Sequence, residues 1–511
     1  MQSLRNSKYG FLLLGYVLAG WAAAAAGSTL DVAQNRQLFI DDYIIESLKG
    51  ATKTLNQPVK YGSAPVLPMV PEGDPSWEAG MHFCFTTILF DESDDLYKMW
   101  YSLWGAKDQS MILAYAYSRD GIGWVKPSLG IVEHRGSRDN NIIMDEDGLE
   151  TGGCIDPRGT DPARRFKMLY QGIRAAYSAD GLRWTDYKDG EKVIFHAPGH
   201  DSQPVPYWDG RLGKYVAIIR DRTGMIKEVR KKMVSDPWAR KVYAQLWGGP
   251  KKDRVPENHS LRRVGQVESD DFVHWTPMRT VVAADDRDPM HRDQFYNMQV
   301  MLHDELRIGF MTVFSYGYER PRGPVQLTYS RDGLNWHRGG GREVFLPTSE
   351  RPGDFDWGFI WPVQGPLVRD DEIWIYYVGW GADHNSEPPD GFTGFKSGVA
   401  LSKLRLDGFV SVDAGAEAGV LTTKPFRFRG GELLINADAG SGRVQVEILS
   451  TEGQPLESFG RGDCDALESD AVRHRVSWNG QGNLKGLEGQ PVRLKFHLEN
   501  AKLFSFGFRD R

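Results

Sequence analysis

A short phrase of the form Ser-x-Asp-x-x-x-Trp occurs four times in this chain of 511 residues. Each copy follows an apolar, strand-like run, and the tryptophans lie roughly 60, 91 and 61 residues apart, a spacing typical of repeated β-sheet units. The phrase indicates a hairpin: Asp bonds backbone N–H groups of the turn, Gly suits its positive-φ position, and Trp starts the next strand. The copies span residues Ser118–Trp124, Ser178–Trp184, Ser269–Trp275 and Ser330–Trp336.

Four such hairpins predict a β-propeller, in which each sheet is one blade. A fifth unit, at 362–401, keeps the shape of the others without the phrase and ends in the turn Asp407-Gly408-Phe409. We expect the N-terminal segment near 37–45 to supply its missing outer strand, because a closed ring has no exposed sheet edge. The sequence therefore predicts five blades within residues 37–412.

The pattern changes near residue 416. Short alternating runs, separated by turns rich in Gly, Asn and Asp, predict a β-sandwich over residues 420–511. The predicted fold is thus all-β, a five-bladed β-propeller followed by a C-terminal β-sandwich. Since no low-complexity linker separates the two parts, we expect them to pack together.

The N-terminus is typical of an exported protein. Arg5 and Lys8 precede an apolar run at 11–18 and small residues up to Ala26, which together predict a signal peptide over residues 1–26. We expect a periplasmic or secreted protein without membrane contact after cleavage; the alternative is an uncleaved anchor. Three cysteines in so long a chain exclude a disulfide framework.

Composition and motifs narrow the class of function. A net charge of −6 disfavours nucleic acid as a partner. The sixteen tryptophans have two interpretations: they fill the cores of a strand-rich fold, or some of them line a carbohydrate groove. On the second interpretation, the expected partner is a carbohydrate. No phosphate loop, His-Glu-x-x-His, paired Cys motif or nucleophile elbow occurs. We expect no cofactor; a divalent cation on the propeller axis is compatible with the fold but has no sequence signature. The oligomeric state stays open.

The loops that lead into the innermost strands of a propeller converge at one mouth. Here these leading loops are rich in acids and aromatics. Carboxylates with different surroundings take different pKa values, which suits the acid and base of glycoside hydrolysis. The candidate catalytic residues are Glu78, Asp156 and Asp201. The candidate substrate-binding residues are Trp77, His82, His200, Gln203, His291, Asp293, Tyr296, Asp356 and Trp357.

These residues also have structural interpretations. Asp156, which precedes a proline, suits a turn cap, and a lone His near a strand start is often structural. The aspartates of the four repeated turns are interpreted as structural, because they recur in every unit whereas an active site occurs once.

The hairpins and leading loops resemble the five-bladed propeller glycoside hydrolases of families 32 and 43, over residues 37–412. Ile155-Asp156-Pro157 is similar to the Arg-Asp-Pro stretch of family 32, which implies that Asp156 stabilises the transition state. The family motifs Asn-Asp-Pro-Asn and Glu-Cys are absent; Glu78, or less favourably Asp74, stands near the nucleophile's place, and Asp201 is the acid nearest the general acid's place. The C-terminal sandwich is similar to the one appended to family 32 enzymes.

The resulting expectation is an exported glycoside hydrolase acting on a poly- or oligosaccharide, such as the furanosides fructan or arabinan. Asp201 is the expected general acid and Glu78 the nucleophile or base. Carboxyl groups about 5 Å apart favour retention, and a separation of roughly 6.5–9.5 Å favours inversion. The alternative is a non-catalytic carbohydrate-binding propeller, motivated by the missing motifs. A protein-interaction propeller fits the acidic, aromatic loops less well.

Overall fold

The chain folds into β-strands joined by turns. The computed structural model describes residues 29–105, 110–145, 148, 150–171, 173–194, 202–221, 262–285, 287–288, 293–315, 322–384, 389, 391–392 and 396–510. Within these ranges the helical segments are the 3-10 turns η1 (Pro162–Arg164), η2 (Tyr187–Gly190), η3 (Gly340–Arg342) and η4 (Lys485–Leu487). The predicted all-β class is confirmed. The predicted signal peptide lies outside the described residues.

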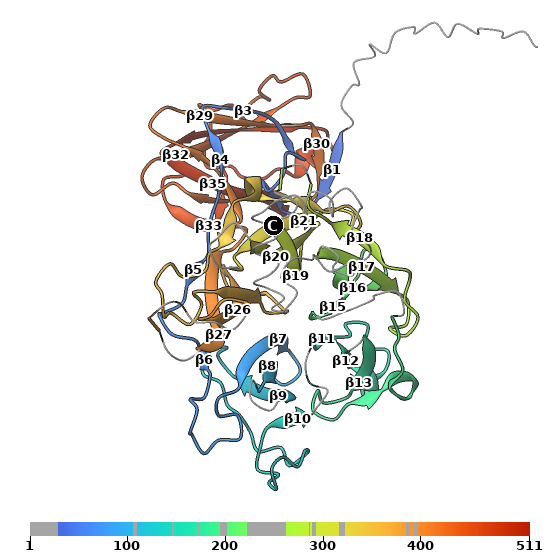
Figure 1. The fold of residues 1–511 in the computed structure, drawn as a ribbon. Helices are drawn as coiled ribbons and strands as arrows, with labels where there is room; N and C mark the ends of the chain where they lie inside the picture. The colour runs from blue at the N-terminus through green and yellow to red at the C-terminus, as the bar shows by residue number, and fades with distance from the viewer. Residues whose placement is uncertain are drawn as a thin grey trace, which may run out of the picture.

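Three four-stranded antiparallel sheets follow one another between residues 82 and 282 (Figure 1). The first holds β7 (His82–Asp91), β8 (Leu96–Trp104), β9 (Met111–Ser118) and β10 (Ile142–Met144). The second holds β11 (Gly152–Ile155), β12 (Phe166–Tyr170), β13 (Arg174–Ser178) and β14 (Thr185–Asp186). The third holds β15 (Val205–Asp209), β16 (Lys214–Asp221), β17 (Arg263–Ser269) and β18 (Arg279–Val282).

A fourth and a fifth sheet continue the series. The fourth holds β19 (Asp293–His303), β20 (Leu306–Ser315), β21 (Val325–Ser330), β22 (His337–Arg338) and β23 (Val344–Leu346). The fifth holds β24 (Phe359–Pro362), β25 (Leu367–Arg369), β26 (Glu372–Trp380) and β27 (Ser397–Arg405), with β5 (Val59–Lys60) and β6 (Leu67–Pro68) on its outer side. An N-terminal segment does complete this sheet, but the predicted residues 37–45 are wrong, because β5 and β6 pair with β27.

The five sheets form a closed ring (Figure 1). Strands of each sheet contact the next, from β7 with β11 and β11 with β15, through β15 with β19 and β19 with β24. The ring closes where β26 and β27 of the fifth sheet contact β7 of the first. The innermost strands β7, β11, β15, β19 and β24 therefore surround the centre.

The repeated turns form as the sequence predicts. Oδ1 of Asp120 accepts the backbone N–H groups of Ile122 and Gly123 at 2.8 Å. Gly121 has φ of 75°, and its carbonyl oxygen accepts the hydroxyl of Tyr376, in the fifth sheet, at 2.7 Å. The turn of the first sheet is thus also a contact with the sheet before it in the ring.

The same contact recurs at the next copies. The carbonyl of Gly181 accepts the indole N–H of Trp100, in the first sheet, at 2.7 Å. A Cβ at Gly181 would lie 2.7 Å from the Trp100 ring, so glycine permits this approach. The carbonyl of Gly333 accepts Nε2 of Gln266, in the third sheet, at 2.9 Å. Docking onto the preceding sheet explains why the phrase recurs around the ring.

Glutamine side chains bridge the centre of the ring. Nε2 of Gln203 donates to the carbonyl oxygens of Thr86 at 3.0 Å and Thr151 at 2.9 Å. Its Oε1 accepts Nε2 of Gln299, from the fourth sheet, at 2.7 Å. Buried polar groups require hydrogen-bond partners, and Gln203 finds them in three neighbouring sheets. With its own sheet, its side chain therefore links four of the five sheets.

Two further sheets lie beside the ring and enclose a separate apolar core. One holds β28 (Val410–Ala414), β31 (Glu432–Asp438), β33 (Asp470–Arg475) and β35 (Ala501–Arg509), with β2 (Gln37–Leu38) and β4 (Thr52–Leu55). The other holds β29 (Gly419–Thr423), β32 (Arg443–Leu449), β34 (Arg493–Glu499) and β3 (Ile45–Lys49). A short pair, β1 (Leu30–Ala33) and β30 (Phe426–Phe428), adjoins them.

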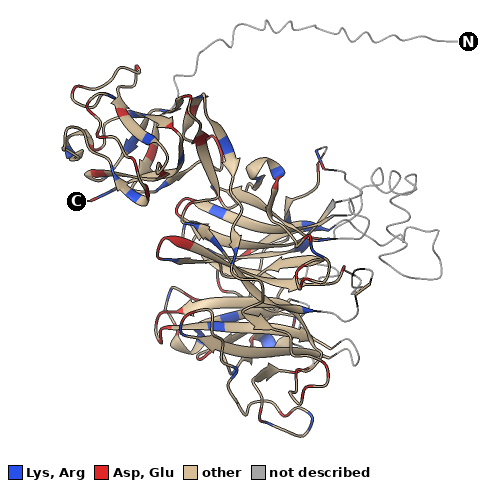
Figure 2. Cartoon of the chain, turned by 90° about the vertical axis from the view of Figure 1, so that its left-hand side faces the viewer, with Lys and Arg blue, Asp and Glu red and all other residues tan. Residues whose placement is uncertain are grey.

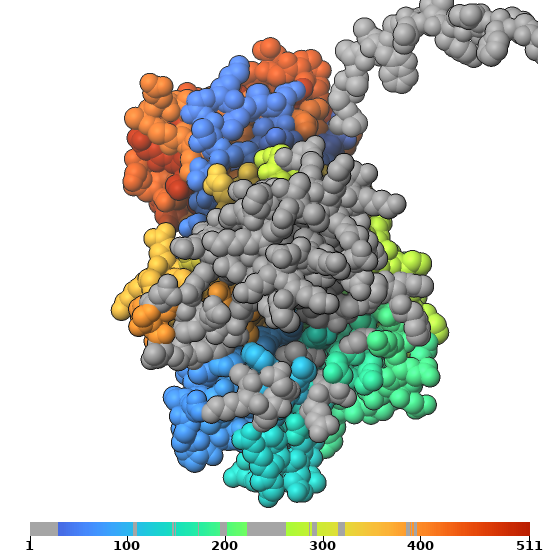
Figure 3. All heavy atoms as spheres, in the orientation of Figure 1, coloured from blue at the N-terminus to red at the C-terminus, as the bar shows by residue number. Residues whose placement is uncertain are grey.

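The N-terminal strands β2, β3 and β4 thus pair with strands from the C-terminal part of the chain. Figure 3 shows this mixture, with blue N-terminal residues packed against orange C-terminal ones. The sequence predicts that the ring begins at residue 37. The pairing of β2, β3 and β4 instead puts these strands with the second group of sheets, and the chain enters the ring only with β5.

Charged residues of both signs are mixed over both groups of sheets in Figure 2. Within the described ranges, no helix is long and apolar enough to cross a membrane.

Candidate active site at the mouth of the ring

The innermost strands give the ring two distinct ends. Thr87 of β7 bridges in parallel to Gln364, which follows β24, and every sheet repeats the same order from inner to outer strand. The innermost strands therefore begin at one end of the ring, here called the mouth, and finish at the other, the far end. Loops joining the second strand of a sheet to its third strand also reach the mouth, because neighbouring strands are antiparallel.

Asp156 lies at the far end, directly after β11. It is 7% exposed and accepts the hydroxyl of Tyr215, from the third sheet, at 2.5 Å. Nε of Arg158 donates to its other oxygen at 3.1 Å, and Nζ of Lys167 lies 3.5 Å away. Burial alone raises the pKa of Asp156, but the bonds from Arg158 and Tyr215 outweigh it and hold the pKa below its usual value.

Asp156 belongs to a repeated set of polar contacts between sheets. Asp91, Asp209 and His303 finish the innermost strands of the first, third and fourth sheets, and each binds a residue of the next sheet in the ring. The contacts are Asp91 with Arg165, Asp156 with Tyr215, Asp209 with Arg307, His303 with Asp407, and Arg369 with Tyr97. This recurrence favours a structural role for Asp156, and its interpretation as a transition-state stabiliser stays a prediction.

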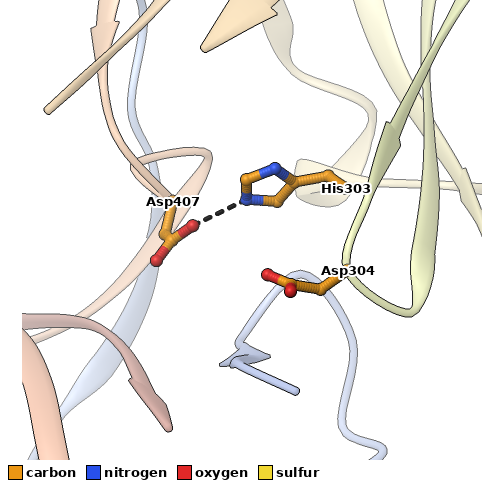
Figure 4. Close-up of side chains that lie close together, drawn as sticks. All are labelled: His303, Asp304 and Asp407. Atoms are coloured by element: carbon orange, nitrogen blue, oxygen red, sulfur yellow. Dashed lines mark hydrogen bonds and ion pairs between the residues drawn. The ribbon is translucent and has the colours of Figure 1, made fainter. Parts of the chain in front are cut away.

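The His303–Asp407 contact also joins the two groups of sheets. Nε2 of His303 lies 2.6 Å from Oδ1 of Asp407, with Asp304 beside them (Figure 4). Arg36, just before β2, binds Asp304 at 2.7 Å and Asp407 at 3.2 Å. Ser505 of β35 donates to Asp407 at 2.6 Å. His303, Asp304 and Asp407 are close enough to share a metal ion, but the Arg36 guanidinium already contacts both carboxylates and offsets part of their charge.

Glu78 lies in the loop that leads into β7, and it is bound within the first sheet. It is 4% exposed, and Nζ of Lys126 donates to its Oε1. The hydroxyl of Tyr101, in β8, lies 3.5 Å from Oε2. Its neighbour Trp77 donates its indole N–H to Asn141, just before the outermost strand, at 3.1 Å. Both side chains are therefore held by outer parts of their own sheet.

Asp356 is held in the same way in the fifth sheet. It is 3% exposed and accepts Nζ of Lys60, in the outer strand β5, at 2.7 Å. The hydroxyl of Tyr377, in β26, donates to the same oxygen at 3.1 Å. Glu78 and Asp356 thus anchor their leading loops, and the structure does not bring Glu78 together with Asp156, since one precedes its strand and the other follows it.

The remaining predictions fall in different places. Gln203 spans the ring centre, where both ends of its amide bind protein groups. Trp357 precedes β24 at the mouth, with the Arg322 guanidinium 5.3 Å from its ring. Asp293 is the first residue of β19, and nothing about its side chain is described. His200, Asp201 and His291 lie outside the described residues.

An aromatic cluster lies at the mouth and includes the predicted residues His82 and Tyr296. The ring centroid of His82 lies 5.9 Å from that of Trp104 and 6.3 Å from that of Trp380. Trp380 meets Trp361 edge-on at 4.6 Å, and Trp361 lies 5.9 Å from Tyr296. This series, called the mouth cluster below, joins residues of the first, fourth and fifth sheets.

His384 extends the mouth cluster. Its Nε2 lies 3.2 Å from the hydroxyl oxygen of Tyr296. Its ring centroid also lies 4.7 Å from that of Phe314, in β20. The preceding residue, Asp383, is 2% exposed, so a buried carboxylate stands next to His384 in the chain.

Sequence reasoning missed Asp383 and His384. It considered only the loops that lead into innermost strands, whereas these two residues follow β26 and precede the third strand of their sheet. The signal that could have found them is the polar pair directly after Trp380-Gly381, at the end of a strand that runs towards the mouth.

Burial changes the titration of His82. The side chain is 8% exposed, and burial lowers its pKa to about 4. His82 is therefore neutral near pH 7 and can hydrogen-bond without carrying charge.

Two polar groups of the mouth retain unused hydrogen-bonding capacity. Asn297, directly after Tyr296, is 6% exposed, and neither its amide nitrogen nor its oxygen has a protein partner within the described structure. The same is true of the indole N–H of Trp361, at 5% exposure. Buried polar atoms are normally paired, so these groups suit a polar ligand or ordered water.

Three arginines adjoin the mouth. The Arg220 guanidinium, 2% exposed, lies 4.3 Å from the Tyr296 ring centroid and donates to the Tyr296 carbonyl at 2.7 Å. The Arg262 guanidinium, 4% exposed, lies 5.4 Å from the same centroid and donates to the Gln294 amide oxygen at 3.1 Å. The third is Arg322, beside Trp357.

The ring axis itself is polar but neutral. Gln364 of the fifth sheet donates to the carbonyl of Pro206 at 2.7 Å and accepts the N–H of Gly153 at 3.0 Å. Gln203 and Gln299 complete the bridge. Among the described residues, a divalent cation on the ring axis would find amide and hydroxyl oxygens as ligands. Such cations favour sites that include carboxylates. The expectation of no cofactor, with an axial cation compatible with the fold, stays a prediction.

Comparison with known proteins gives distant likenesses only. No protein family matches the chain, and no curated protein matches it. Among solved structures, one described as a glycoside hydrolase is 14% identical, with a TM-score of 0.45 over 68% of this chain and 92% of that one. An N-acetylgalactosamine deacetylase from F. plautii, in complex with blood group B trisaccharide, is 12% identical, with a TM-score of 0.43 over 70% and 96%.

A thermostable family-43 glycoside hydrolase is 13% identical, with a TM-score of 0.41 over 67% of this chain and 96% of that one. All three structures are therefore at most 14% identical to this chain, with TM-scores of 0.45 or below.

Proposed function

We propose that the chain is a five-bladed β-propeller with an appended β-sandwich, and that it is an exported glycoside hydrolase whose active site is the mouth. The closed ring of five sheets and the separate core of the remaining two support the architecture. The sugar would rest against the mouth cluster, because aromatic faces and a few convergent polar groups are the usual lining of a saccharide site.

The observation that carries the proposal is the buried carboxylate of Asp383, directly before His384, whose imidazole contacts Tyr296 in the mouth cluster. Glycoside hydrolysis requires a carboxyl pair. Asp383 is proposed as one member, and the predicted residues Asp201 and Asp293 are the candidates for the other. Asn297 would bind a sugar hydroxyl with its unused amide. Glu78 and Asp156 are proposed as structural.

The test measures reducing-sugar release from a panel of plant and algal polysaccharides that includes fructan and arabinan. Asp383→Asn should lower kcat/KM by about 100-fold or more, the usual effect of removing an acid–base group. Asp209→Asn is the matched control, since Asp209 is an equally buried carboxylate at the far end. Equal losses in both variants, after correction for the folded fraction, would overturn the assignment of Asp383.

A second candidate function is a non-catalytic carbohydrate-binding propeller. It is favoured by the ion pairs of Glu78 and Asp156, which leave two predicted catalytic carboxylates occupied. Saturable binding of a polysaccharide by the parent protein, without release of reducing ends over a prolonged incubation, would decide for it.

A further inference from the structure

Buried glutamine side chains close the ring axis below the mouth. Gln203, Gln299 and Gln364 are each at most 5% exposed. Their amides bond across the axis, from the third sheet to the first, second and fourth, and from the fifth sheet to the second and third. A saccharide chain that enters along the axis from the mouth therefore cannot pass through the ring.

Buried polar atoms without a protein partner gather at this level of the described structure. They include both amide atoms of Asn297, at 6% exposure, and the indole N–H of Trp361, at 5%. They also include Oε1 of Gln299 and Oγ1 of Thr86, in side chains that are at most 1% exposed. Because buried polar atoms are normally paired, this group indicates a place where a polar ligand binds.

Asn297 and Trp361 lie on the mouth side of the closed axis. Asn297 precedes Gln299 by two residues of β19, which is roughly 7 Å along a strand. Trp361 precedes Gln364 by three residues. Since both innermost strands run from the mouth to the far end, a ligand from the mouth reaches Asn297 and Trp361 before it reaches the glutamines.

β-Bulges re-aim the side chains around Trp361. In β7 and again in β19, two residues near the mouth oppose a single residue of the second strand. Phe85 and Asn297 are the second residues of these two bulges, and Tyr296 is the first residue of the bulge in β19. The Trp361 ring lies 6.3 Å from that of Phe85 and 5.9 Å from that of Tyr296. Bulges of this kind are common beside binding and active sites.

We infer that the mouth binds the terminal sugar of a saccharide chain, with Asn297 and Trp361 bonding to hydroxyl groups of that sugar. The amide of Asn297 offers a donor and an acceptor side by side, which suits two neighbouring hydroxyls, and Trp361 adds a second donor. Only a chain end reaches buried groups in front of a closed axis, so hydrolysis here is exo-acting. The inference rests on the proposed function for the place of the sugar, but not for its hydrolysis.

Single sugars test the inference, because a site for a terminal sugar holds one ring. Calorimetry of the full chain is run with the methyl glycosides of glucose, galactose, mannose, xylose, arabinose, fructose, fucose and rhamnose. We expect at least one of them to bind saturably, and Asn297→Leu to weaken that binding by about tenfold or more, since the hydrogen bonds of the amide are lost. Absence of saturable binding for all eight glycosides would overturn the inference.

Stability separates a ligand-binding role of Asn297 from a structural one. Asn297→Leu removes no protein hydrogen bond, so its unfolding temperature should equal or exceed that of the parent protein. Asn141→Leu is the matched control: Asn141 is 3% exposed, and its amide donates to the Tyr101 hydroxyl and the Tyr115 carbonyl, both at 2.7 Å. This control should unfold at a lower temperature, while its folded fraction keeps the parent's sugar affinity.

The opposite pattern would contradict the assignment. If Asn297→Leu loses stability as Asn141→Leu does and its folded fraction binds sugar as the parent protein does, Asn297 is structural. If the variant does not fold at all, the glycoside titration of the parent protein still decides whether a single sugar ring is bound.

The products of hydrolysis distinguish this inference from the proposed function. On a polysaccharide that the parent protein cleaves, exo action predicts one small sugar as the first product, with little early loss of viscosity. A ladder of oligosaccharides with an early fall in viscosity would refute the terminal-sugar site and keep the hydrolase. Glycoside binding that Asn297→Leu weakens, without turnover of any polysaccharide, would refute the hydrolase and keep the terminal-sugar site.

Discussion

Glu78 and Asp356 occupy equivalent places in the first and fifth sheets. Each is bound by a tyrosine of its second strand and a lysine of its outer segment. The tyrosines match in register as well, since Tyr101 pairs with Ala114 and Tyr377 pairs with Ala400. This arrangement of an acid, a tyrosine and a lysine occurs in two sheets of the ring, which suits a structural role in holding the leading loops. A catalytic pair, in contrast, is expected once.

The first prediction concerns this anchor. Glu78→Gln and Asp356→Asn should each lower the free energy of unfolding by about 1–3 kcal/mol, because a partly buried lysine loses its counter-charge. Chemical denaturation measures this loss. Substrate turnover per folded molecule should change by less than about tenfold. Abolished turnover in a protein of unchanged stability would show that the anchor interpretation is mistaken.

The second prediction concerns Asp156 and acid. Its folded-state pKa is lowered, so the carboxylate stabilises the fold above the unfolded pKa of about 4, and this contribution is lost as the pH falls below that value. Asp156→Asn should therefore be less stable than the parent protein at pH 6, by about 2 kcal/mol, and should lose less stability between pH 5 and pH 3.

Urea titrations of both proteins at the two pH values measure the difference. Asp354→Asn serves as a comparison, since Asp354 is a half-buried aspartate outside the far-end set, and the partners given for its carboxylate are the nearby residues Ser349, at 2.5 Å, and Arg351, at 3.8 Å. Parallel stability curves for the parent and Asp156→Asn would contradict the far-end role.

The third prediction concerns His82. Its pKa is lowered from an ordinary value near 6.5 to about 4, so the unfolded chain binds a proton between these values and the folded chain does not. Stability should rise with pH across this window, and the parent protein should be less stable at pH 4 than at pH 7 by up to about 3 kcal/mol from this group.

His82→Gln keeps a polar side chain without the ionisable ring and should flatten the stability curve between pH 4 and pH 6.5. Thermal or urea unfolding over this range gives the curve. An unchanged slope would mean that His82 takes up its proton in the folded state as readily as in the unfolded state.

Part of this structure is predictable from sequence because its determinants are local. The Asp120 turn and its copies form through bonds within five residues, so the phrase predicts both the hairpins and their repetition. The strands Leu96–Trp104 and Glu372–Trp380 likewise follow from their apolar runs. Five units could be counted from these signals alone.

Other features depend on contacts between distant residues. The N-terminal strands β2 to β6 are all short, so the sequence does not show which sheet each one joins. Pairing with distant strands decides this: β2 to β4 join the two sheets beside the ring, and β5 and β6 join the ring itself. The place of Asp156 at the far end could not be predicted, because the residues around Pro157 do not show which end of a strand faces the mouth. Asp383 was missed because its loop joins the second strand to the third.

The most direct measurement is the ratio of kcat/KM between the parent protein and three variants, Asp383→Asn, Glu78→Gln and Asp156→Asn, on the polysaccharide that the parent protein cleaves, corrected for the folded fraction of each. A mouth site centred on Asp383 predicts a loss of about 100-fold or more for Asp383→Asn and less than about tenfold for the other two. Normal turnover by folded Asp383→Asn, with activity abolished in folded Glu78→Gln or Asp156→Asn, would contradict it.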